Sequence, residues 1–114
     1  MNLHSWNDIL REQMNDLVVR QVIHGINTTI ARLEMKRGAM VARHHHVNEQ
    51  MTVMMSGRLR FVFPEKTVDV VGGEVMEIEP NLPHSVEALE DSVAIDVFAP
   101  VREDWRRGDD AYLR

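Results

Sequence analysis

The chain has 114 residues, 44% of them hydrophobic and 27% charged, a composition typical of one globular domain with a core of modest size. The net charge of −5 gives no reason to expect nucleic acid or an anionic membrane as a partner. Cysteine is absent, which excludes disulfides and thiolate metal sites, so any metal must be held by nitrogen and oxygen ligands. With no signal peptide and no apolar run of roughly 18 residues, we expect a cytoplasmic protein.

The first stretch, Ser5 to Val19, has the pattern of a short helix. Ser5 or Asn7 would cap its N-terminus. Its apolar face would comprise Trp6, Ile9, Leu10 and Met14. Gly25 ends this region.

After Gly25 the sequence is typical of short β-strands. Residues 26–35 alternate in polarity, and residues 53–63 and 92–100 are rich in β-branched and aromatic side chains. Turn residues recur at Gly38, Gly57, Pro64, Gly72, Gly73, Pro80, Asn81 and Pro100. These regularly spaced turns predict an antiparallel barrel or sandwich. We expect the polar segment 102–114 to pack on the outside of this domain.

Three adjacent histidines stand in the run RHHHVNEQ, residues 43–50. In a strand over residues 39–47, Met40, Ala42, His44 and His46 would share one face. His44 and His46 would then lie roughly 6–7 Å apart, close enough to chelate one ion, while His45 would face away. Glu49 and Gln50 are both candidates for a third ligand.

His84 is a fourth candidate ligand, in the run EIEPNLPHSV. Pro80 and Pro83 restrict the backbone before it, and Asn81 can adopt a left-handed turn conformation. A histidine on a rigid corner is typical of a pre-positioned ligand.

A late strand, residues 92–99, carries an aspartate among apolar residues. Asp96 would share a face with Ala94 and Phe98. If that face lines the interior, burial would raise the pKa of Asp96 and suit it to acid–base work; the alternative is an edge strand facing water. Arg60 and Arg102 are both candidates for holding a substrate carboxylate, and the alternative for Arg102 is a surface ion pair with a neighbouring acid.

Residues 38–57 resemble the first cupin motif, in which a glycine, His-x-His, a glutamate and a second glycine follow at set intervals. The positions that fit the spacing are Gly38, His44, His46 and Gly57. Gln50 stands where the motif has glutamate, with Glu49 one residue early. The resemblance implies an all-β, single-domain cupin over residues 1–114, a jelly-roll barrel (double-stranded β-helix) with a short N-terminal helical segment.

Residues 72–88 resemble the second cupin motif. Gly73 opens it and His84 is its histidine. Glu79 and Asn81 replace the proline and glycine usual in the motif, which bears on the turn before His84 and not on the ligand.

A narrower resemblance is to the small single-domain cupins of pectin and alginate degradation, homodimers that open 4,5-unsaturated uronates to linear 4-deoxy-5-keto uronates. It implies one divalent ion (zinc, nickel, iron, cobalt or manganese) on His44, His46, Gln50 and His84. It also implies a sugar-acid substrate, with Asp96 and Arg102 catalytic and Phe98 lining the pocket. The alternatives are a metal-dependent dioxygenase, a lyase acting on another carboxylate, and a sugar-binding cupin without activity.

Overall fold

The computed structural model describes all 114 residues and consists mainly of ten β-strands. The strands are β1 (Glu12–Asn15), β2 (Val18–His24), β3 (Thr29–Met35), β4 (Met40–His44), β5 (Glu49–Ser56), β6 (Arg58–Val62), β7 (Thr67–Val71), β8 (Val75–Ile78), β9 (His84–Ala88) and β10 (Ser92–Ala99). The helical elements are the 3-10 turns η1 (Trp6–Asp8) and η2 (Ala111–Leu113) and the single-turn helix α1 (Glu103–Arg106).

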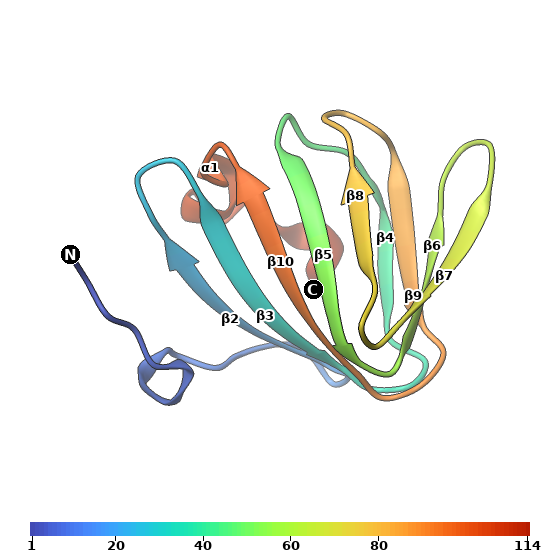
Figure 1. Ribbon diagram of the computed structural model, residues 1–114, viewed down its shortest axis with the longest axis horizontal. Helices are drawn as coiled ribbons and strands as arrows, with labels where there is room; N and C mark the ends of the chain where they lie inside the picture. Colours follow the sequence, from blue (N-terminus) through green and yellow to red (C-terminus); the bar gives the residue numbers. More distant parts are fainter.

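The strands form two antiparallel sheets that face each other (Figure 1). One sheet has the order β1-β2-β3-β10-β5-β8 and the other the order β4-β9-β6-β7. The predicted all-β jelly roll is confirmed, since neighbouring strands in each sheet come from distant parts of the chain. No helix has the length and apolar character needed to cross a membrane.

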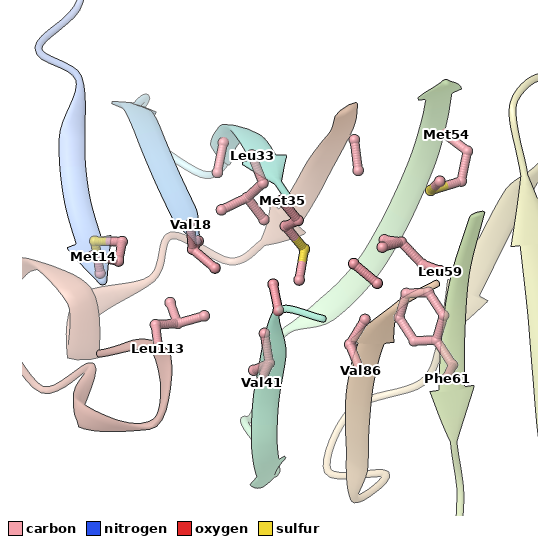
Figure 2. Packing of buried hydrophobic residues seen from close by; sticks show 14 of the residues in the cluster. Met14, Val18, Leu33, Met35, Val41, Met54, Leu59, Phe61, Val86 and Leu113 are labelled. Atoms are coloured by element: carbon pink, nitrogen blue, oxygen red, sulfur yellow. The ribbon is translucent and has the colours of Figure 1, made fainter. Parts of the chain in front are cut away.

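The hydrophobic core fills the space between the two sheets (Figure 2). Along β3 the side chains alternate strictly, so that Leu33 and Met35 are buried while their neighbours are partly exposed. Leu59 and Phe61 of β6 meet them from the opposite sheet. Several core residues also line a cavity that contains polar side chains, among them His44, His84 and Asp96.

The helix predicted for residues 5–19 is mostly wrong. Only the turn Trp6–Asp8 is helical, and the rest of the segment begins a hairpin between β1 and β2. The β-branched run that starts at Val18 favours a strand. This strand pairs with β1 and with β3, and Val18 and Met14 lie in the core. Tertiary pairing has overridden a weak helical pattern.

The C-terminal segment, residues 102–114, does not pack on the outside as predicted. Trp105 and Leu113 belong to the core cluster, and η2 packs against β4. Asp110 forms an ion pair of 2.9 Å with Arg20, and the side chains of both residues are almost fully buried. The segment therefore completes the barrel wall, and its polar residues are paired inside it.

We predict that Gly57→Ala destabilises the fold far more than Gly73→Ala. Both glycines have positive φ, at 85° and 90°. A Cβ on Gly57 would overlap Ser92 Oγ and the carbonyl oxygen of Asp91, whereas a Cβ on Gly73 would meet nothing within 4 Å. Urea unfolding should show a loss of about 1–2 kcal/mol for Gly73→Ala and about 3 kcal/mol or more for Gly57→Ala. Equal losses would contradict the overlap.

Candidate metal centre

His44 lies at the end of β4, where the strand carries a β-bulge. Val41 and His44 are three residues apart on β4 but pair with residues two apart on β9. Val41 is buried while Met40 and Ala42 are exposed, and the bulge turns His44 to the same inner side as Val41. The predicted alternation, with Met40, Ala42 and His44 on one face, is therefore wrong, although His44 still reaches the site.

His46 lies in the loop between β4 and β5, outside any strand. The side-chain amide of Asn48 donates hydrogen bonds to the carbonyls of Pro100 (2.6 Å) and Val101 (3.2 Å), which fastens this loop to the end of β10. The Nδ1 atom of His46 lies 3.0 Å from the carbonyl oxygen of Asn48. The loop buries His46 and leaves His45 exposed, as predicted for His45.

His84 opens β9 directly after the proline-rich turn. Asn81 has φ 65°, which confirms the left-handed conformation expected of it. Its N–H donates to the carbonyl oxygen of His46 at 2.8 Å, so the two sequence motifs are hydrogen-bonded to each other. The Nδ1 atom of His84 lies 2.8 Å from the carbonyl oxygen of Leu82, and the side chain is 1% exposed.

The three histidines converge, with their ligand nitrogens within 4.8 Å of one another. In each ring Nδ1 faces a backbone carbonyl, and the carbonyl partner of His44 is Ala42 at 2.8 Å. A carbonyl can only accept, so Nδ1 carries the hydrogen and Nε2 keeps a lone pair. These three imidazoles could therefore hold a metal ion.

Burial keeps the imidazoles neutral, the form that binds metals. Desolvation lowers the pKa of His44 to about 3 and that of His46 to about 4, and it also lowers the pKa of His84. The Nε2 atom of His84 is buried and has no hydrogen-bond partner in the chain. An unpaired buried acceptor is costly, and a shared divalent cation would satisfy it.

Gln50, and not Glu49, points into this site. Glu49 is exposed, whereas Gln50 is buried one residue later on the inner face of β5. Gln50 Oε1 lies 3.0 Å from His46 Nε2. Its amide Nε2 donates to Thr52 Oγ1 at 2.9 Å, and Thr52 donates to Asp96 Oδ1 at 2.6 Å. This chain of bonds turns the amide oxygen of Gln50 toward the imidazoles.

Asp96 lies on β10 and lines the same cavity. Ala94, Asp96 and Phe98 are all buried, which confirms that this face of the strand lines the barrel interior. Desolvation raises the pKa of Asp96 to about 6, although the hydrogen bond from Thr52 opposes the shift. The carboxyl group can therefore both take up and release a proton near neutral pH.

Arg102 also lines the cavity and is 1% exposed. Its guanidinium lies over the rings of Phe98 (4.6 Å) and Trp105 (4.2 Å). Nε and Nη2 donate to the two carboxylate oxygens of Asp104 at 2.9 and 2.8 Å, and Nη2 also donates to the hydroxyl of Tyr112. The ion pair with a neighbouring acid exists, but it fixes Arg102 inside the cavity and leaves Nη1 without a partner.

Arg60, the other predicted carboxylate ligand, is not part of this site. Leu59 and Phe61 on either side of it point into the core, so Arg60 lies on the outer face of β6. Its guanidinium donates to the two oxygens of Asp69 at 2.8 and 3.1 Å. The structure corrects the prediction because strand parity sends Arg60 away from the cavity.

Three cavity-lining residues escaped the sequence analysis: Thr52, Trp105 and Tyr112. Thr52 could have been predicted from the sequence, since it lies two residues after Gln50 on the same face of the strand. Tyr112 stacks on the His44 ring with centroids 4.1 Å apart and planes 17° apart. Nothing in the spacing of the last segment indicates that its aromatic residues return to the histidines.

The arrangement is that of a known family. The family model for the cupin domain matches residues 31–98. The chain belongs to the cupin domain family. Both motifs found in the sequence, residues 38–57 and 72–88, lie within the matched region.

Solved structures of other cupins share this fold. KdgF from Halomonas sp. has a TM-score of 0.79 and 22% identity, over 87% of this chain and 94% of that one. An RmlC-like cupin from Shewanella frigidimarina has a TM-score of 0.84 and 18% identity, over 92% of this chain and 96% of that one. Oxalate decarboxylase from Bacillus subtilis, which has Mn(II) centres, has a TM-score of 0.76 and 22% identity, over 87% of this chain and 29% of that one. These identities show a common fold alone, and no curated protein sequence matches the chain.

We predict that this cupin binds one divalent cation per chain and that His84→Ala abolishes tight binding. Removing a ligand should weaken binding by more than the roughly 10–100-fold typical of an outer-shell partner. Titration of chelator-treated protein with Co²⁺ or Zn²⁺, followed by calorimetry, measures the affinity. His45→Ala is the matched control, because His45 is exposed and should leave the affinity unchanged. Equal affinities in the two variants would contradict the assignment.

Proposed function

We propose that this cupin catalyses the metal-dependent ring opening of 4,5-unsaturated uronates to linear 4-deoxy-5-keto uronates, a step of pectin and alginate breakdown. The proposal rests on one observation: a single cavity combines neutral imidazoles, a carboxamide, a carboxyl group of raised pKa and a guanidinium. The resemblance of the sequence to small cupins with this activity gives the same residue types the same roles.

In this proposal one divalent ion is held by His44, His46, His84 and Gln50. The distance of 3.0 Å between Gln50 Oε1 and His46 Nε2 supports the fourth ligand, because both atoms present lone pairs and would repel each other without a cation between them. Two ligands about 2.1 Å from one ion are roughly 3.0–3.4 Å apart. Imidazole and amide ligands accept zinc, nickel, iron, cobalt or manganese.

The ligand set favours an anionic substrate. When bound, the ion supplies Lewis-acid polarisation of substrate oxygens. All four ligands are neutral, so no carboxylate in the ligand set offsets the cationic charge. A uronate carries both the ring oxygens and the carboxylate that such a site attracts.

Asp96 is proposed to move the proton. Its carboxylate removes the proton of the anomeric hydroxyl as the bond between C1 and the ring oxygen breaks and C1 becomes an aldehyde. The ring oxygen leaves as an enolate on C5, and Asp96 returns the same proton to C4, which gives the C5 ketone. Atoms and electrons balance without an oxidant. A pKa of about 6 suits both proton transfers.

Arg102 is proposed to hold the substrate carboxylate through Nη1. Nε and Nη2 are engaged by Asp104 and Tyr112, so the guanidinium is held in place before the substrate arrives. Phe98 packs between the guanidinium and the His46 ring, where it shields the cavity from water. This shielding strengthens the attraction between the guanidinium and a carboxylate.

Two alternatives lead to different measurements. An oxidative cupin would be favoured by a carboxylate ligand, but Glu49 is exposed and the inward position is occupied by Gln50. A sugar-binding cupin without activity would bind uronates and leave the rate of ring opening unchanged. A cytoplasmic location and a homodimer stay predictions.

The activity itself is tested with freshly prepared 4,5-unsaturated galacturonate. The metal-loaded protein should accelerate the loss of the enol absorbance over buffer, and a chelator should abolish the acceleration. Binding of the compound without acceleration would identify a sugar-binding protein instead.

We predict that Asp96→Asn lowers the rate constant of ring opening by about 10²–10⁴-fold, the usual range for loss of a general acid–base group. The amide keeps the size of the side chain but cannot carry the proton. Asp69→Asn is the matched control, because Asp69 pairs with Arg60 on the outer face and its loss should leave the rate unchanged. Full activity of Asp96→Asn would refute the proton-transfer role.

A further inference from the structure

Tyr112 is a polar residue of the cavity to which the proposed reaction gives no direct contact with the substrate. It lines the cavity, its ring stacks on His44, and its hydroxyl lies beside Arg102 and Trp105. The residue comes from η2, the last structured turn of the chain. The hydroxyl of a tyrosine in this position must form its hydrogen bonds with the atoms that surround it.

Two donors meet at the hydroxyl oxygen of Tyr112. Arg102 Nη2 donates one hydrogen bond, and Trp105 Nε1 donates another at 2.7 Å. Arginine and tryptophan side chains carry no acceptor, so neither bond can run in the opposite direction. A phenolic oxygen has two lone pairs and one hydrogen. Both lone pairs are therefore occupied by the protein.

The hydrogen of this hydroxyl has no acceptor in the chain. No hydrogen bond has Tyr112 as its donor. Because both lone pairs are occupied, the hydroxyl can act toward a bound ligand only as a donor. The donations from Arg102 and Trp105 also polarise the O–H bond and strengthen it as a donor.

We propose that Tyr112 is a substrate-binding residue, whose hydroxyl donates to one carboxylate oxygen of a sugar acid while Arg102 Nη1 donates to the other. The inference rests on the proposed function for the class of ligand. Two neighbouring donors complement the two oxygens of a carboxylate and match a hydroxymethyl group poorly. Tyr112 and Arg102 together would thus select a uronate over the neutral sugar.

The chain offers a direct test, because it contains a single tyrosine. Growth on 3-fluorotyrosine therefore alters this hydroxyl alone. Fluorine makes the phenol a stronger donor and a weaker acceptor, so the sign of the effect separates donation to a ligand from mere bracing of Arg102 and Trp105. The probe is D-galacturonate, a saturated uronate that cannot undergo the reaction, with D-galactose as the neutral counterpart.

We predict that the zinc-loaded fluorotyrosine protein binds galacturonate more tightly than the unlabelled protein, and that galacturonate but not galactose shifts the ¹⁹F resonance. Tyr112→Phe should weaken galacturonate binding about tenfold or more, the range for a hydrogen bond to a charged group. Calorimetry and ¹⁹F NMR provide the affinities and shifts.

Weaker binding by the fluorotyrosine protein, unchanged binding by Tyr112→Phe, or no galacturonate binding at millimolar concentration by the unlabelled protein would overturn the inference. The test of ring opening and the test of galacturonate binding by Tyr112 can fail independently of each other. If galacturonate binds as predicted but unsaturated galacturonate opens no faster than in buffer, Tyr112 recognises a sugar acid in a different reaction. If ring opening proceeds but Tyr112 makes no difference, the proposed function stands and only this inference falls.

Discussion

The site depends on the way three imidazole rings are tied to the backbone. Each ring places Nδ1 against a carbonyl two residues away, so the local backbone decides where Nε2 points. Three different devices set that backbone: a bulge before His44, a loop fastened by Asn48 for His46, and a proline-rich turn for His84. The result is a cluster of buried lone pairs, which costs free energy in the folded protein unless a cation is shared among them.

The other half of the cavity is organised by the C-terminal segment. Trp105 lies between two guanidinium groups, Arg20 at 4.5 Å and Arg102 at 4.2 Å from its ring. Asp110 pairs with Arg20 and Asp104 pairs with Arg102, which balances both charges. The Arg102 guanidinium, the neutral ligands and the Asp96 carboxyl group thereby line one cavity. Such an arrangement suits an anionic substrate whose reaction moves one proton.

Much of the site could be predicted from the sequence because ligand spacing is a local property. The positions of His44, His46 and His84 in two short motifs indicate a shared ion, and strand alternation correctly turns Asp96 inward. The expected alternation of side chains failed at β4, because the strand contains a β-bulge. No residue type in this stretch indicates the extra residue of the bulge. The N-terminal hairpin and the folded-back tail were missed since both depend on partners far along the chain. Tyr112 is the clearest case, because it contacts His44 of β4 although the two residues are far apart in the sequence.

We propose that one cation sits among four side chains from two distant motifs. Anomalous diffraction at the zinc absorption edge, from crystals of untagged protein loaded with one equivalent of Zn²⁺, tests this placement. We expect a single anomalous peak about 2.0–2.2 Å from the Nε2 atoms of His44, His46 and His84 and from Oε1 of Gln50. A map with no peak among these atoms, or with the metal bound elsewhere, would contradict it.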